Sequence, residues 1–193
     1  MNLRITMLLA CGALFALPAQ AAQDGCPQGS YSVVVSPDHT TLSILFDKFN
    51  LDTSNASPAA TGGTVNKVCH ITYPLNLPAN MSLGVYKVDY RGFAKLAPTQ
   101  EASVEVKYAL SPQGNEHGRV FTRKVKGSYE GDYFFTENIG AGQMKRVGCG
   151  SDAKLVMQIE LALRGSGDAL ASLDTSDGKT AAMVYHLNLK KCN

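Results

Sequence analysis

The chain has 193 residues, of which 45% are hydrophobic and 18% are charged, and its 18 basic residues against 16 acidic ones give a net charge of +2. This near balance excludes a surface-wide field that attracts nucleic acid or an anionic membrane, while a local basic patch remains compatible with it. The length suits one domain that buries a sizeable hydrophobic core.

The first 21 residues have the features of a secretory signal peptide. Residues 5–17 are apolar and follow Arg4, and Ala19-Gln20-Ala21 is a small-residue cleavage site. We expect cleavage after Ala21, which leaves residues 22–193 as a single secreted domain. Neither the leader nor any later apolar run reaches the roughly 18 residues that a membrane helix needs. Cys11 leaves a lipoprotein interpretation open, although it would shorten the apolar run to about six residues.

Beyond the leader, the chain has the pattern of successive β-strands separated by turns. Apolar and polar residues alternate with a period of two, which indicates half-buried strands and does not fit one face of a helix. We therefore expect an all-β protein of about nine or ten strands, an antiparallel β-sandwich of jelly-roll or immunoglobulin-like type. The expected strands are residues 30–36, 41–49, 65–73, 83–90, 101–110, 119–126, 129–139, 154–164 and 181–189.

Three of the intervening segments have the composition of loops. Residues 52–64 are Ser, Asn, Ala, Pro, Thr and Gly with little to bury, which is typical of a mobile surface loop. Residues 111–115 form a turn, and residues 174–178 form another that includes the hairpin signal Asp-Gly. The aspartates of the second turn resemble part of a calcium loop, but the glutamate that closes such a loop is missing.

The stretch from residue 69 to residue 96 is the most characteristic part of the chain. Its alternation places Tyr86, Val88 and Tyr90 on one face and Arg91 on the other. Gly92 follows directly and indicates a bulge or bend. We therefore expect Tyr90 to be buried, and Tyr90 and Arg91 to have structural roles.

Four cysteines remain after the leader, and an even number in a secreted chain predicts two disulfides. Four cysteines allow three connectivities, and the sequence alone does not choose among them. Two pairs have equal separations along the chain, which favours Cys26–Cys69 and Cys149–Cys192. The cysteines form no close pair such as CxxC, so the spacing argues against zinc.

Several segments together resemble a family of small secreted proteins of fungi and bacteria, the domain-of-unknown-function family numbered four-three-six-zero. The resemblance covers nearly the whole mature chain, and its specific part is the Asp89-Tyr90-Arg91-Gly92 segment with the four cysteines. It implies export and a disulfide-bonded β-domain, and it implies no established activity and no catalytic residues. Members of the family often have a Trp near the third and last cysteines, whereas this chain has none. The supporting segments are Gly25-Cys26-Pro27, residues 42–46 with Asp47 and Phe49, Cys69, residues 86–93, Gly131-Asp132-Tyr133, Cys149-Gly150, and Asp177-Gly178 leading to Cys192.

No catalytic constellation is evident, and we expect no catalytic residue, metal or cofactor. Histidines 39, 70, 117 and 186 are scattered without ligand spacing. The binding candidates are four basic residues on one expected strand, Arg119, Arg123, Lys124 and Lys126. They fit either a charged edge strand that prevents sheet-to-sheet aggregation or a site for an anionic polymer. Residues 129–135 carry an aromatic cluster that fits core packing, or stacking on a glycan.

Three hypotheses for function follow from these features. The first is a secreted, non-catalytic binding or structural module that recognises an envelope or host polymer. The second is a polysaccharide hydrolase that uses carboxylates such as Asp89, Glu130 or Asp132, which requires two of them to converge in a cleft about 5–10 Å apart. The third is an exported effector or inhibitor that presents the 52–64 loop to a partner protein.

Overall fold

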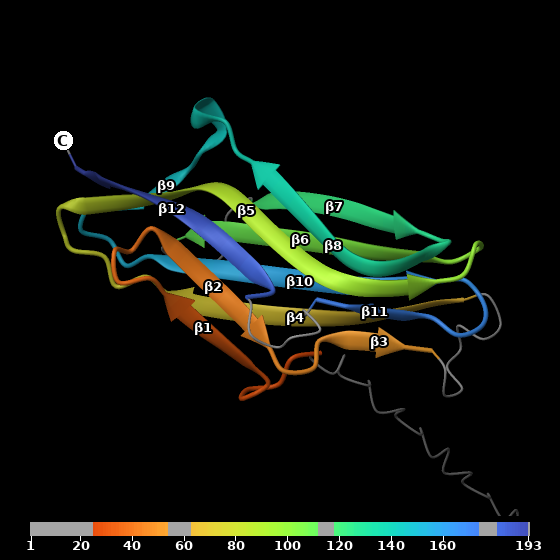
Figure 1. The fold of residues 1–193 in the computed structure, drawn as a ribbon. Coiled ribbons are helices and arrows are strands. Elements are labelled where there is room, and N and C mark those ends of the chain that lie inside the picture. The colour runs from red at the N-terminus through yellow and green to blue at the C-terminus, as the bar shows by residue number, and fades with distance from the viewer. Residues whose placement is uncertain (1–24, 54–62, 112–117, 174–180, 193) are drawn as a thin grey trace, which may run out of the picture.

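A computed structural model describes residues 25–53, 63–111, 118–173 and 181–192. The expected leader, most of the 52–64 loop, and the turns expected at 111–115 and 174–178 lie wholly or largely outside these residues. The described part contains twelve β-strands and one short 3-10 turn (Figure 1). They are β1 (Tyr31–Val35), β2 (Thr41–Phe46), β3 (Asn50–Asp52), β4 (Thr64–Pro74), β5 (Met81–Leu96), β6 (Glu101–Ser111), β7 (Arg119–Lys126), β8 (Tyr129–Asn138), η2 (Ala141–Gln143), β9 (Arg146–Gly148), β10 (Lys154–Arg164), β11 (Leu170–Ser172) and β12 (Met183–Lys191).

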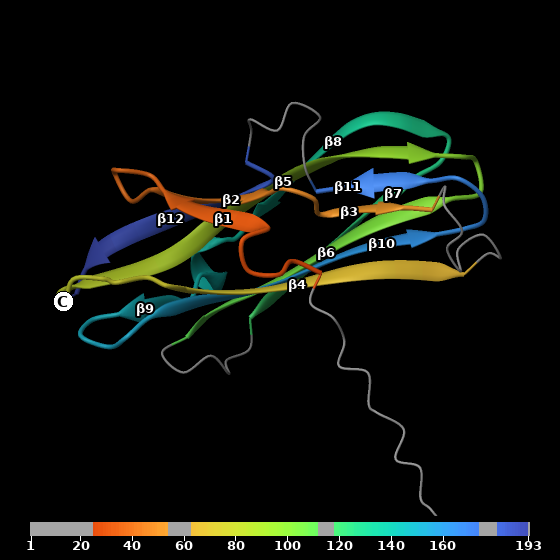
Figure 2. The ribbon, with the colours of Figure 1, turned by 90° about the horizontal axis from the view of Figure 1, so that it is seen from below.

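The strands form two antiparallel sheets that pack face to face, which confirms the expected all-β sandwich (Figure 2). The small sheet has four strands in the order β4-β10-β6-β7. The large sheet has eight, and β5 lies at its centre. Strands β12 and β11 pair in succession with one edge of β5, and β9 and β8 pair with the other. Strands β2 and β1 continue the sheet beyond β12, and β3 continues it beyond β11.

Three short strands were not expected from the sequence. Strands β3, β9 and β11 have three residues each, too few for an alternating pattern to be recognised. Their pairing is instead decided by neighbours: β9 and β11 lie against opposite edges of β5, and β3 pairs with β11.

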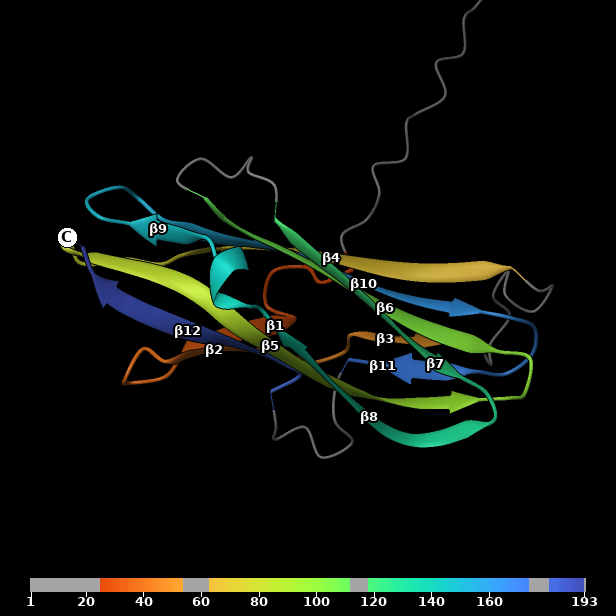
Figure 3. The same ribbon diagram turned by 90° about the horizontal axis from the view of Figure 1, so that it is seen from above.

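The core lies between the sheets, and Figure 3 shows the two layers from above. Strand β10 has long neighbours on both sides, β4 and β6. The five inward apolar residues of β10, from Leu155 to Leu163, are each exposed by 1% or less. Tyr108 of the small sheet meets Tyr185 of the large sheet edge to face, with ring centroids 5.7 Å apart. The strict alternation of the central strands thus supplies the core, as the sequence predicted.

A bulge in β5 changes the face on which Tyr86 lies. His186 pairs with Lys87 and Leu187 pairs with Val85, so Tyr86 is an extra residue opposite β12. The side chains beyond it are shifted by one position, which leaves Val88 and Tyr90 buried and Tyr86 42% exposed. The expectation that Tyr86 shares their face was wrong, because simple alternation does not anticipate a bulge.

Gly92 does not form a bulge against β8, and the structure gives it a role in the contact between non-neighbouring strands. The pairing of β5 with β8 continues in register through Gly92 and Tyr133. The Tyr133 hydroxyl donates a 2.6 Å hydrogen bond to the carbonyl oxygen of Ser172, on the strand at the opposite edge of β5. A Cβ at Gly92 would collide with that carbonyl and with the tyrosine ring. The glycine is therefore required by a side chain that crosses over the strand.

Two disulfides are present, Cys26–Cys69 and Cys149–Cys192. The first joins the segment before β1 to β4, beside a 2.6 Å hydrogen bond from Gly25 N to the oxygen of Val68. The second joins the segments that follow β9 and β12. Each bond links residues 43 positions apart, so each stabilises the fold chiefly by restricting the unfolded chain.

Two buried tyrosines provide a matched test of this packing. The hydroxyl of Tyr90 donates a 2.8 Å hydrogen bond to Glu137 Oε1, whereas the buried hydroxyl of Tyr185 has no hydrogen-bond partner among the described residues. We predict that Tyr90→Phe lowers the free energy of unfolding by about 1–2 kcal/mol, and that Tyr185→Phe leaves it unchanged or raises it by up to about 1 kcal/mol. Urea melts of both variants measure the difference, and an equal loss in both would contradict it.

Candidate functional site

A cavity of 590 Å³ opens at the end of the sandwich that carries the C-terminus. One wall comes from inward-facing residues of the large sheet, namely Val35, Leu83, Leu187 and Leu189. The opposite wall comes from the end of β4 and the connection to β5, which includes Leu75 and Leu77. Figure 2 shows β5 beginning and β12 ending at this side of the molecule. The remaining lining residues are Asp38, His39, Tyr73, Pro74, Asn76, Pro78 and Met81.

The cavity is a consequence of where β4 ends. Pro74 is the last residue of β4, and Pro78 follows in the connection, and a proline cannot donate a hydrogen bond to a sheet ladder. The small sheet therefore stops here while β12 continues to Lys191. The alternation of β12 still turns Leu187 and Leu189 inward, so their side chains face an irregular segment instead of a strand.

Polar groups line this cavity from two separate segments. Asp38 and His39 belong to the turn between β1 and β2, and Asn76 belongs to the connection after β4. The backbone is in the left-handed region at both His39 (φ 54°) and Asn76 (φ 44°). Histidine and asparagine are among the non-glycine residues that adopt this region most often, and such residues occur frequently at ligand-binding positions.

The four basic binding candidates lie on β7, the edge strand of the small sheet, and divide between its two faces. Alternation along β7 separates Arg119 and Arg123 from Lys124 and Lys126, which point to the opposite face of the strand. Lys124 forms an ion pair with Glu101 at 2.7 Å, and Arg119 donates to the carbonyl oxygen of Gln143 at 2.8 Å. Arg119 also lines a smaller hollow of 250 Å³, together with Lys107.

Arg123 connects the two sheets. Its guanidinium donates two hydrogen bonds, of 2.7 and 2.8 Å, to the carboxylate of Glu137 on β8. That carboxylate is only 7% exposed and also accepts the hydrogen bond of Tyr90. Burial, followed by the neighbouring carboxylate, raises the pKa of Tyr90. Arg123 is therefore a structural residue that neutralises a carboxylate between the sheets.

The outer face of the large sheet carries a second polar group, centred on Asp89. Asp89 Oδ2 lies 2.8 Å from Lys87 Nζ and 2.7 Å from His186 Nε2, and Oδ1 accepts a 2.7 Å hydrogen bond from Thr136. Burial by itself raises the pKa of Asp89, but the hydrogen bonds from Lys87, Thr136 and His186 outweigh it and hold the pKa below its usual value. Sequence reasoning missed this cluster because His186 is 97 positions from Asp89.

Exposed aromatic side chains flank the Asp89 cluster. Tyr86 lies beside the His186 ring, with centroids 5.8 Å apart. Phe134 is 58% exposed, and the Arg91 guanidinium lies 6.0 Å from its ring centroid. Tyr133, from the same aromatic cluster of the sequence, is buried and belongs to the core. Tyr133 of that cluster thus packs in the core, whereas Phe134 is accessible to a ligand.

None of the three carboxylates considered for hydrolysis lines the cavity. Glu130 and Asp132 are two positions apart on one face of β8, about 7 Å along the strand, and both are exposed. Asp89 is bound by its three neighbours. Asp89 pairs with Thr136, four residues from Asp132, and this spacing along a strand corresponds to roughly 14 Å. Glu130 is paired with Lys95 at 3.2 Å.

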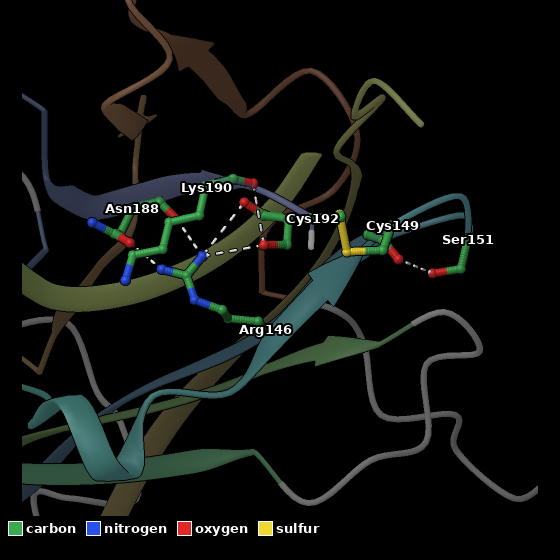
Figure 4. Close-up of a disulfide and its surroundings, with 8 residues drawn as sticks. Arg146, Cys149, Ser151, Asn188, Lys190 and Cys192 are labelled. Atoms are coloured by element: carbon green, nitrogen blue, oxygen red, sulfur yellow. Dashed lines mark hydrogen bonds between the residues drawn. A yellow bond between two sulfur atoms is a disulfide. The ribbon is translucent and has the colours of Figure 1, made fainter. Parts of the chain in front are cut away.

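An arginine strengthens the cavity end of the large sheet, next to the second disulfide (Figure 4). Arg146 of β9 reaches across β5 and donates to the side-chain oxygen of Asn188 on β12, to its carbonyl oxygen at 3.1 Å, and to Ser82 Oγ at 3.4 Å. Cys149 N donates to the oxygen of Met81, and Cys192 N donates to the oxygen of Asn80. Three strands are therefore fixed together where Met81 lines the cavity.

Within the described residues, no group of three or more His, Cys, Asp or Glu side chains is arranged to hold a metal ion. His117 lies outside those residues. The described part of the chain also has no helix long and apolar enough to cross a membrane.

Comparison with known proteins places this geometry in a wider context. Residues 19–192 match the family described as "Domain of unknown function (DUF4360)". The chain is also similar to a curated protein of Arthroderma benhamiae named "Uncharacterized secreted protein". The two are 22% identical over 170 residues, which cover 87% of this chain and 67% of the relative.

The Asp89 cluster predicts a dependence of stability on pH. A carboxyl whose pKa is lowered by folding stabilises the protein above its unfolded pKa of about 4, and that contribution is lost as the pH falls through the folded value. We predict that Asp89→Asn lowers the free energy of unfolding by about 1–2 kcal/mol at pH 7 and by much less at pH 2. The control Glu130→Gln removes an exposed ion pair and changes stability by less than about 0.5 kcal/mol. Denaturant melts at both pH values provide the measurement, and a deficit for Asp89→Asn that stays constant with pH would contradict it.

Proposed function

The chain belongs to the family named Domain of unknown function (DUF4360), and on that premise we propose that it is a secreted, non-catalytic binding module whose inter-sheet cavity holds an apolar or amphiphilic small molecule. The cavity carries the proposal. Its 590 Å³ lie within the range of about 300–1,000 Å³ that is usual for ligand sites. Its mostly apolar lining with a few polar groups is also typical of such sites.

Apolar burial supplies the affinity for such a ligand. Each 100 Å² of apolar surface that the ligand removes from water contributes about 2.5 kcal/mol. Leu75, Leu77, Leu187 and Leu189 provide that surface on opposing walls. The disulfide and the Arg146 contacts hold the same end of the large sheet, so little ordering is left to oppose binding.

A secreted location agrees with the two disulfides, which persist in oxidising compartments. It also agrees with the related fungal protein, whose name describes it as secreted. We propose in addition that residues 1–21 are removed as a signal peptide and that residues 22–193 form the mature domain.

The other hypotheses have less support. An anionic polymer bound along β7 would compete with the partners of Arg123 and Lys124. A hydrolase requires two carboxylates that converge in a cleft, whereas Asp89, Glu130 and Asp132 all lie outside the cavity lining. The loop of the effector hypothesis lies mostly outside the described residues.

One observation favours a second candidate function, recognition of an envelope or host glycan by the outer face of the large sheet. Of the four exposed large hydrophobic residues in the described chain, Val34, Tyr86 and Phe134 lie on this face. Exposed apolar side chains gathered on one surface indicate an interaction site. Asp89, Lys87 and Thr136 lie between the two aromatic rings and offer hydrogen-bond donors and acceptors to sugar hydroxyls.

Filling the cavity tests the first proposal. Val35 lines the cavity, and its neighbour Val34 is 53% exposed on the other face of the same strand. We predict that Val35→Trp weakens binding of a neutral fluorescent naphthylamine probe by tenfold or more because the indole occupies the space, whereas Val34→Trp changes it by less than about twofold. Fluorescence titration measures both, after circular dichroism has shown that each variant is folded. Equal binding by the two variants would contradict the proposal.

Truncating the aromatic side chains tests the second candidate. We predict that Phe134→Ala and Tyr86→Ala each weaken retention on insoluble polysaccharide several-fold, because each removes a stacking surface. Val120→Ala is the control, since Val120 is 54% exposed but lies on the small sheet. A glycan whose retention is unchanged in both aromatic variants does not bind at this face.

A further inference from the structure

We propose that the cavity selects amphiphiles with a cationic or uncharged polar end over those with an anionic end. This inference rests on the proposed binding function and specifies the chemical class of its ligand. It follows from the charges that the described residues place around the cavity.

The turn between β1 and β2 fixes a negative charge at the cavity. Asp38 Oδ1 accepts hydrogen bonds from Ser36 Oγ at 2.5 Å and from Thr40 N at 3.1 Å. His39 N donates to the oxygen of Ser36 at 2.9 Å and closes the turn. These bonds stabilise the ionised carboxylate, since hydrogen bonds from Ser36 and then Thr40 lower the pKa of Asp38. The group is therefore a carboxylate at neutral pH.

Among the described residues that line the cavity, no lysine or arginine neutralises that carboxylate. Their other titratable groups are the imidazole of His39 and the hydroxyl of Tyr73. An anionic head group would enter beside Asp38 without a fixed positive partner, and like charges repel. An ammonium head group would gain the attraction of the same carboxylate.

Uncharged head groups also find partners here. Asn76 offers an amide that donates and accepts hydrogen bonds, and His39 offers a ring nitrogen. These two residues come from different segments, and both have left-handed backbone conformations. An alcohol or ester head group can therefore be bound without a charge.

The expected selectivity is moderate because Asp38 is exposed to solvent. Two unit charges about 4 Å apart in water attract or repel enough to change an affinity about fivefold. Because added salt screens exposed charges, the preference should decrease as the ionic strength rises. Burial of the ligand's alkyl chain does not depend on its head group and contributes equally to the affinity of all these ligands.

The experiment compares dodecylamine, dodecanol and dodecanoate as competitors of the naphthylamine probe, each below its micelle concentration. At low salt the parent protein should bind the amine about fivefold more tightly than the alcohol, and the alcohol about fivefold more tightly than the carboxylate. Asp38→Asn keeps a side-chain oxygen for the turn and should abolish the preference, whereas Asp47→Asn, an exposed change outside the cavity lining, should preserve it. His39→Gln removes the imidazole and should leave the amine favoured.

The outcomes separate the two proposals. The charge inference is overturned if the carboxylate binds as tightly as the amine, or if Asp38→Asn keeps the preference while its unfolding curve matches that of the parent. If Asp38→Asn is unstable, a salt titration of the parent decides instead, and an amine preference that persists at high salt overturns the inference. The binding function itself fails if no competitor displaces the probe, or if Val35→Trp binds all three as the parent does.

Discussion

The structure depends on β5, the strand with which four other strands of the large sheet pair. It has 16 residues and pairs with β12 and β11 on one edge and with β9 and β8 on the other. In addition, side chains from one edge of β5 cross the strand and bind residues at its other edge. Tyr133 crosses at Gly92 to bind Ser172, and Arg146, which pairs with Gly84, reaches Asn188. These contacts join strands that are not neighbours in the ladder.

The bulge at Tyr86 divides β5 into two segments with different roles. Before it, Leu83 faces the cavity, and after it, Val88 and Tyr90 face the core. The same shift turns Tyr86 outward, beside His186 and the Asp89 cluster. One extra residue thus adds the Tyr86 ring to the outer polar surface, which is the second of the two candidate sites.

The charged residues show why a basic strand is a weak indicator of a binding site. On β7, alternation directs Arg123 toward Glu137 and Tyr90, where it connects the sheets, and directs Lys124 to an exposed pair with Glu101. A carboxylate between two sheets requires a donor, and an arginine at the edge of the opposite sheet provides it here while its side chain stays 48% exposed. On this strand, the position of Arg123 is explained by its contact with Glu137 in the opposite sheet.

The sequence by itself determined the fold class, the number of disulfides and the burial of Tyr90, because the alternation within each strand and an even cysteine count can be read from the chain without its partners. It did not determine the short strands β3, β9 and β11 or the bulge at Tyr86, since these depend on pairing with β5. Only the tertiary structure brought Asp89 to His186, and Val35 to Leu77 and Leu189. The physical reason is that the surfaces and cavities of a sandwich are formed by strands that are far apart in sequence. The alternation within one strand predicts only which of its faces is buried.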